Sequence, residues 1–165
     1  MLVLVSDASV LIELSKWSIL VEIFELPFEF AVPDALFEEE LIDLGSTTNL
    51  QLKSLGLRVE ELDEEGVDQA VIYQKSNPRL SLNDCFAVSL AKNNSWPLIT
   101  GDKRMKNFAQ AEQVETYGCL WILDALTQHG VIESSRMLEV LDGMLRDPTT
   151  RIPHVEINKR ILELS

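Results

Sequence analysis

Residues 2–7 read Leu2-Val3-Leu4-Val5-Ser6-Asp7, and residues 97–102 read Pro97-Leu98-Ile99-Thr100-Gly101-Asp102. In both stretches a short apolar, β-prone run ends in small residues and an aspartate. Continuous apolar runs of this length are typical of strands that are buried on both faces of a parallel sheet. A helical pattern follows each aspartate, so both stretches predict a buried strand that leads directly into a helix.

Strand-like and helical segments alternate along most of the chain. Besides these two strands, the sequence predicts strands at 28–32, 57–62 and 114–120. The segments with a helical pattern are 33–43, 64–76, 82–92 and 103–112, followed by 121–128, 134–146 and 155–164. This alternation favours an α/β fold with a largely parallel sheet, and the last part of the chain is expected to contain helices only.

Length and composition predict one domain with a substantial core, since the chain has 165 residues of which 46% are hydrophobic. The apolar run Met1–Val5 is too short for a signal peptide or a membrane span, which predicts a soluble, cytoplasmic protein. Cys85 and Cys119 are far apart in the sequence, and so are His129 and His154. Neither a disulfide framework nor a zinc site is therefore expected.

The formal charge is strongly negative. With 14 basic and 27 acidic residues it is −13, which has the wrong sign for binding nucleic acid through the overall field. A cluster of carboxylates neutralised by a divalent cation would explain part of the acidity. For the remainder two interpretations stay open, a solvated acidic surface and a surface that binds a basic partner.

Three aspartates lie where predicted helices begin, and each has an ordinary structural interpretation. Asp7 and Asp102 follow strands and could cap the next helix, a role that Asp often fills. Asp84 follows Ser81 at the spacing of a capping box. Taken singly, none of the three indicates an active site.

Their shared position in the predicted fold suggests more. In a parallel α/β sheet the strand-to-helix junctions all lie at the carboxyl edge, where ligands usually bind. Asp7, Asp84 and Asp102 would meet there, and Glu39, in the second turn of its predicted helix, would reach the same edge. Converging carboxylates are unfavourable without a cation, and an all-oxygen site favours Mg²⁺ or Mn²⁺.

Four motifs occur in order along the chain and resemble the PIN-domain family, which includes the VapC toxins of toxin–antitoxin pairs. They are Val5-Ser6-Asp7-Ala8-Ser9-Val10-Leu11-Ile12, Val32-Pro33-x-x-Leu36-x-x-Glu39, Leu82-x-Asp84-x-x-Ala87-x-x-Leu90-Ala91 and Leu98-Ile99-Thr100-Gly101-Asp102. The resemblance implies a three-layer α/β/α domain over residues 1–125, with a central, mostly parallel sheet of four to five strands. Residues 126–165 would form a helical C-terminal extension packed on the same domain, as in an uncharacterised prokaryotic PIN subfamily.

The resemblance also implies an activity and a site. The expected protein is a Mg²⁺- or Mn²⁺-dependent endoribonuclease that hydrolyses RNA phosphodiester bonds, the toxin of a toxin–antitoxin pair, and a homodimer. The residues expected to bind one or two metal ions and carry catalysis are Asp7, Glu39, Asp84 and Asp102. Ser9 and Thr100 would orient Asp7 and Asp102 or a metal-bound water. Met105 departs from relatives that carry a further acid near this place.

Several points stay open at this level. Glu38 and Glu40 flank Glu39, only the spacing from Leu36 selects Glu39, and three consecutive helical side chains cannot all face one site. The cluster 103–106 contains three basic residues that either hold flanking phosphates or form a solvated helix face.

Two alternatives to the nuclease follow from the same residues. The first is a PIN binding module without catalysis, or one held by an antitoxin whose basic segment enters the carboxylate pocket. The second is a phosphotransfer domain on a similar sheet. An aspartyl-phosphate phosphatase would need an acid at Ser9, and a receiver domain would need one at Ser6, so the sequence disfavours both.

Overall fold

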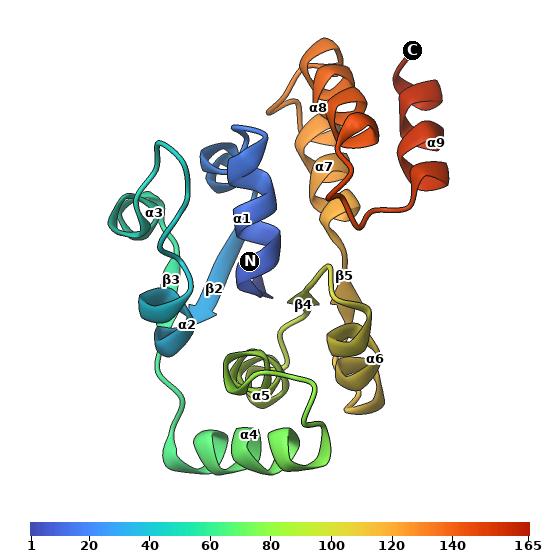
Figure 1. The fold of residues 1–165 in the computed structure, drawn as a ribbon. Helices are drawn as coiled ribbons and strands as arrows, with labels where there is room; N and C mark the ends of the chain where they lie inside the picture. Colours follow the sequence, from blue (N-terminus) through green and yellow to red (C-terminus); the bar gives the residue numbers. More distant parts are fainter. The chain divides into compact units, whose positions relative to one another are not determined.

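The computed structural model describes residues 1–165 (Figure 1). The elements, in chain order, are β1 (Leu2–Ser6), α1 (Ala8–Lys16), the 3-10 helix η1 (Val21–Glu25), β2 (Phe28–Pro33), α2 (Asp34–Glu39), α3 (Asn49–Leu55), β3 (Arg58–Glu60), α4 (Glu64–Ser76), α5 (Leu82–Asn94), β4 (Leu98–Ile99), α6 (Lys103–Ala111), β5 (Thr116–Tyr117), α7 (Cys119–Gln128), α8 (Ser134–Arg146) and α9 (His154–Leu164). The chain divides into two compact units, an N-terminal unit (Met1–Cys119) and a C-terminal unit (Leu120–Ser165).

The five strands form one parallel sheet in the order β3-β2-β1-β4-β5. β1 lies at the centre, where Leu4 and Val5 are fully buried, as the continuous apolar run predicts. β1 pairs with β4 so that Val5 lies opposite Leu98 and Ser6 opposite Ile99. The chain adds strands on one side of β1 and then on the other, which creates a topological switch point between β1 and β4.

Helices cover the sheet on both faces. The connections from β1 to β3 and those from β3 to β5 run in opposite directions along the sheet, and right-handed crossovers therefore place their helices on opposite faces. One buried cluster joins α4, α5 and α6 to the sheet strands β1 and β4. The predicted three-layer α/β/α fold with a parallel central sheet is confirmed.

In the helical layer that contains α4, α5 and α6, α4 packs closely on α5. The buried Ser89 hydroxyl on α5 donates a hydrogen bond to the Gly66 carbonyl of α4 at 2.8 Å. A Cβ at Gly66 would lie 3.1 Å from the side chain of Asn93, closer than most real Cβ contacts. A side chain at position 66 would therefore require Asn93 to shift by a few tenths of an ångström.

Several local features differ from the sequence prediction. The strand expected over 114–120 covers only Thr116–Tyr117, and α7 already begins at Cys119. The helix expected over 33–43 ends at Glu39, and Leu41 N–H donates to the Leu36 carbonyl, five residues back, at 3.3 Å. α3 was not predicted, although Thr48 and Gln51 form a complete capping box at its start. Gly56, at φ 124°, ends this helix in a conformation that favours glycine.

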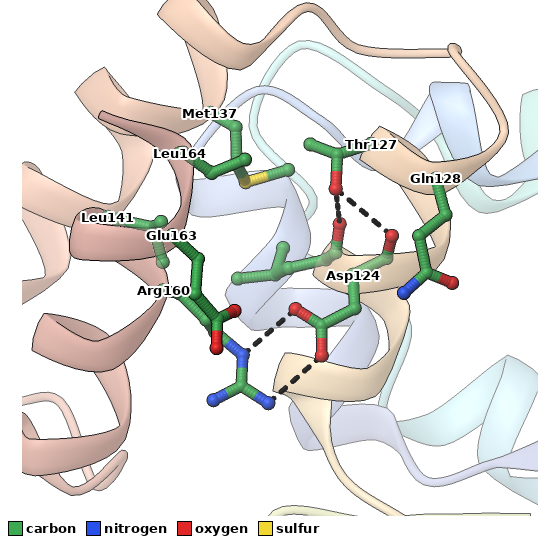
Figure 2. A pocket seen from close by; sticks show the side chains of 9 residues that line it. Asp124, Thr127, Gln128, Met137, Leu141, Arg160, Glu163 and Leu164 are labelled. Carbon is green, nitrogen blue, oxygen red and sulfur yellow. Dashed lines mark hydrogen bonds and ion pairs between the residues drawn. The ribbon is translucent and has the colours of Figure 1, made fainter.

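The C-terminal unit consists of helices, as the sequence predicts. Residues of α7, α8 and α9 line a pocket of about 230 Å³. Figure 2 shows the side chains that line it. At its rim Arg160 on α9 forms a two-point ion pair with Asp124 on α7, both hydrogen bonds being 2.9 Å long. A second ion pair joins Arg160 to Glu156 at 3.0 Å. Such planar, two-point pairing fixes α9 to α7 in one geometry. No helix in the structure has the length and apolar character needed to span a membrane.

Candidate active site

The candidate site lies at the carboxyl edge of the sheet, at the switch point between β1 and β4. Asp7 directly follows β1, and its N–H donates to the Ile99 carbonyl of β4 at 3.1 Å. Continuing the β1–β4 pairing by one residue places Asp7 beside Thr100. This is the position at which open α/β sheets usually bind ligands.

Asp7 is a buried carboxylate, with only 4% of its surface exposed. Its Oδ1 accepts a hydrogen bond from Val10 N–H at 3.0 Å and thereby caps α1. Its Oδ2 accepts one from the Thr100 hydroxyl, and a hydrogen bond with Ser9 contributes as well. Burial nevertheless raises the pKa of Asp7, and the negative charge of Asp84 raises it further.

Thr100 connects Asp7 to the start of α6. Its hydroxyl donates to Asp7 and accepts a hydrogen bond from Asp102 N–H at 3.0 Å. The sulfur of Met105 lies 3.5 Å from the same hydroxyl, and Met105 is fully buried. Position 105 therefore belongs to the core in this chain, and an apolar side chain suits it.

Asp84 and Asp102 both cap helices, which agrees with their ordinary structural interpretation. Asp84 Oδ2 accepts the Ser81 N–H at 3.0 Å, completing the capping box of α5. Asp102 Oδ1 accepts the N–H groups of Arg104 at 2.8 Å and Met105 at 3.5 Å at the start of α6. A carboxylate offers about four lone-pair sites, so these bonds leave capacity for a further ligand.

Two adjacent glutamates at the end of α2, Glu39 and Glu40, lie beside the same edge. Glu39 is exposed, and its Oε2 accepts a hydrogen bond from Asn83 Nδ2 at 2.9 Å. Glu40 is half-buried, and its carboxyl lies in the electrostatic field of Asp84 and Asp7. The spacing from Leu36 predicts Glu39 as the site residue of α2, with Glu38 and Glu40 as alternatives.

The donor chemistry of this edge fits a hard divalent cation. Asp7, Glu40 and Asp84 provide carboxylate oxygens, and burial followed by their mutual repulsion raises the pKa of Glu40. Glu40 Oε2 is shielded from solvent and has no hydrogen-bond partner, which leaves an acceptor without a ligand. In this conformation no group of three or more Asp, Glu, His or Cys side chains converges closely enough to enclose an ion.

Positive charge is available beside the acids. Lys103, Arg104 and Lys106 lie on the first two turns of α6, directly after Asp102, and all three are exposed. Their ammonium and guanidinium groups are suited to contact phosphates of a bound strand. The carboxyl edge therefore combines the buried Asp7 and several partly exposed acids with an exposed basic margin.

The comparison with protein families agrees with this geometry. The model of the family DUF3368, a PIN domain, matches residues 3–165. The match includes every acid of the carboxyl edge and extends through the C-terminal unit. No curated protein matches the chain.

Proposed function

Because the chain belongs to the PIN-domain family, whose members are generally nucleases, we propose that it is a Mg²⁺- or Mn²⁺-dependent endoribonuclease. The observation that carries this proposal is the carboxylate of Asp7, which is buried at the switch point in the field of Asp84. A buried acid whose pKa is raised beside another acid in a ligand-binding position is a typical feature of functional sites.

The metal would be held by Asp7, Asp84 and Asp102 together with one acid from the end of α2. When bound, Mg²⁺ or Mn²⁺ supplies Lewis acidity toward the phosphate and lowers the pKa of a water molecule. These hard cations prefer carboxylate oxygens, and the edge offers no competing imidazole or thiolate among these residues.

The residues of the chain would keep the acids in place and hold the substrate. The Thr100 hydroxyl fixes Asp7 and, through the Asp102 backbone, the start of α6. The Ser81 capping box fixes Asp84 at the start of α5. Lys103 and Arg104 would contact the phosphates beside the scissile bond and offset the overall charge of −13, which repels RNA.

Cleavage of a single-stranded RNA of defined sequence tests the proposal. The purified chain should cleave it with Mn²⁺ or Mg²⁺, should stop when EDTA is added, and should leave a DNA of the same sequence intact. Asp84→Asn keeps the size and capping ability of the side chain but removes the charge, and it should abolish cleavage. Metal-independent cleavage, or full activity of Asp84→Asn, would contradict the proposal.

For the role as a toxin of a toxin–antitoxin pair we propose a small protein with a basic segment as the partner. The formal charge of −13 and the acidic carboxyl edge support this partner, because an Arg side chain could occupy the place of a cation among the carboxylates. When the chain is purified from its native host, such a protein should co-purify with it. Recovery of the chain alone under low-salt conditions would count against the antitoxin.

A further inference from the structure

The pocket of the C-terminal unit has no part in the site at the carboxyl edge. All the residues that line it belong to α7, α8 and α9, and its volume is about 230 Å³ (Figure 2). Side chains in protein interiors pack closely and leave few voids larger than a water molecule. A pocket of this size between three packed helices therefore offers room for a ligand.

One side of the pocket is apolar. Leu123 on α7 and Met137 and Leu141 on α8 line it, and each of the three is only 1% exposed. Leu164 on α9 completes this side. An apolar cavity of about 150 Å³ holds a benzene molecule, so the pocket has room for a phenyl ring with a short substituent. Such a wall fits the hydrocarbon part of a ligand.

The other side of the pocket is charged. Arg160 binds Asp124 through two hydrogen bonds of 2.9 Å and Glu156 through one of 3.0 Å, so its guanidinium already has partners. Glu163 lies three residues after Arg160 on α9, is exposed and forms no ion pair. Figure 2 shows the side chains of Asp124, Arg160 and Glu163 at the lower end of the pocket, and Met137 at the upper end.

The balance of charge at this end favours a cation over an anion. Asp124, Glu156 and Glu163 carry three negative charges, and Arg160 carries the one positive charge among them. An anion would meet the Glu163 carboxylate and would have to compete with Asp124 for Arg160. An ammonium group could instead form charge-assisted hydrogen bonds with Glu163 and with the remaining lone pairs of Asp124.

We propose that this pocket binds a small organic cation, a primary ammonium group on a compact apolar body of about the size of a phenyl ring. The apolar body lies against Leu123, Met137 and Leu141, and the ammonium group binds Glu163 and Asp124. None of these residues belongs to the carboxyl edge, so the proposal does not depend on the nuclease function.

NMR of the methionine methyl groups in the full chain tests this site. Met137 lines the pocket, whereas Met105 is fully buried in the N-terminal unit and serves as the internal control. The chain has four methionines, and Met137→Leu identifies the signal of Met137. Benzylammonium should shift the Met137 signal to saturation and leave Met105 unchanged, with an affinity near the millimolar range that is usual for so small a ligand.

Two uncharged or oppositely charged probes of the same size test the charge. Benzyl alcohol has the same ring without the ammonium group, and benzoate carries a negative charge instead. Benzyl alcohol should bind roughly threefold or more weakly than benzylammonium, because it lacks the ion pair, and benzoate should bind more weakly still.

Two matched variants test the position of the cation. Glu163→Gln removes the unpaired carboxylate at the pocket and should weaken benzylammonium binding roughly threefold or more. Glu139→Gln removes an exposed charge on α8 that does not line the pocket, and it should leave the affinity within about 1.5-fold of wild type. Leu141→Phe fills the apolar side and should abolish binding.

The outcomes decide the proposal in both directions. Absence of a saturable Met137 shift with benzylammonium, equal affinity for benzyl alcohol, or equal affinity of Glu163→Gln and Glu139→Gln would each overturn it. If Leu141→Phe does not fold, the comparison of Glu163→Gln with Glu139→Gln decides alone.

Discussion

Replacing Asp7 by asparagine should make the metal-free protein more stable. Asp7 is 4% exposed, and the charge of its carboxyl is on balance unfavourable there because burial raises its pKa. Asparagine has nearly the same size and caps helices about as well, so the hydrogen bond from Val10 N–H can remain. The substitution removes the charge, and it also replaces the Oδ2 acceptor of the Thr100 hydroxyl by an amide N–H donor.

The expected gain in stability for Asp7→Asn is the difference between two opposing contributions. An ion in the protein interior carries a desolvation penalty of several kcal/mol even after relaxation. Hydrogen bonds from Val10, Thr100 and Ser9 to the carboxylate offset part of this penalty. Because the pKa is raised, the penalty exceeds the return, and we expect a net gain of about 1–2 kcal/mol for Asp7→Asn. In a protein of this size this corresponds to an increase in Tm of roughly 2–8 °C.

The stability gained by Asp7→Asn should increase as the pH rises. The folded-state pKa of Asp7 lies above its ordinary value of 3.8, so the folded protein binds this proton more tightly than the unfolded chain. The wild-type residue therefore contributes stability below the unfolded pKa, and this contribution is lost as the pH rises through the folded pKa. The advantage of Asp7→Asn should be largest at neutral pH and should shrink as the pH falls toward 5.

Thermal unfolding in EDTA at pH 7.5 and at pH 5 measures both effects. Asp68→Asn, which removes an exposed charge from α4, controls for the general relief of the −13 charge. Adding Mn²⁺ should reverse the order, because only the wild type would gain from binding the ion. A lower Tm for Asp7→Asn in EDTA at pH 7.5 would refute the reasoning, since the carboxylate would then act mainly as a stabilising cap.

Three further predictions concern other parts of the structure. Arg160→Ala should lower the unfolding free energy of the C-terminal unit by about 1–2 kcal/mol in urea, because a side chain that is 19% exposed loses two ion pairs. Arg146→Ala breaks an exposed ion pair and should change the unfolding free energy by less than about 0.5 kcal/mol. Thr100→Val should lower the unfolding free energy by about 2–3 kcal/mol, because the hydroxyl bonds both a buried carboxylate and a backbone N–H. Thr100→Ser keeps the hydroxyl and should lose much less stability. Equal losses in the two variants would indicate a packing effect instead. Burial raises the pKa of the Cys85 thiol to about 11 and that of Cys119 to about 12, so both should react with a disulfide reagent at pH 8 far more slowly in the native protein than in denaturant.

The main elements of the fold could be predicted because local pattern and tertiary structure agree there. Leu2–Ser6 is apolar throughout, and a central strand of a parallel sheet needs that pattern on both faces. The short helix α3 was missed because it carries only one fully buried apolar residue, Leu52, and its packing pattern is weak. Its capping box, Thr48 with Gln51, was the available signal.

The candidate site was predictable to the extent that strand ends determine it. Asp7 and Asp102 follow strands on both sides of the switch point, so sheet topology alone brings them to one edge. The acid from α2 depends on the rotation of that helix, which a single spacing does not determine. The apolar residues Leu36 and Phe37 define the buried face, and that face includes Glu40.

RNA cleavage by a double variant tests the central claim most directly. Asp7→Asn with Asp84→Asn removes two carboxylates of the edge, and Glu61→Gln with Glu65→Gln removes two exposed charges elsewhere, so both proteins have the same formal charge. With Mn²⁺ present, we expect the Asp7/Asp84 variant to lose cleavage to the level of the EDTA control and the Glu61/Glu65 variant to cleave RNA like wild type. Equal cleavage by the two variants would contradict a metal-dependent active site at the carboxyl edge.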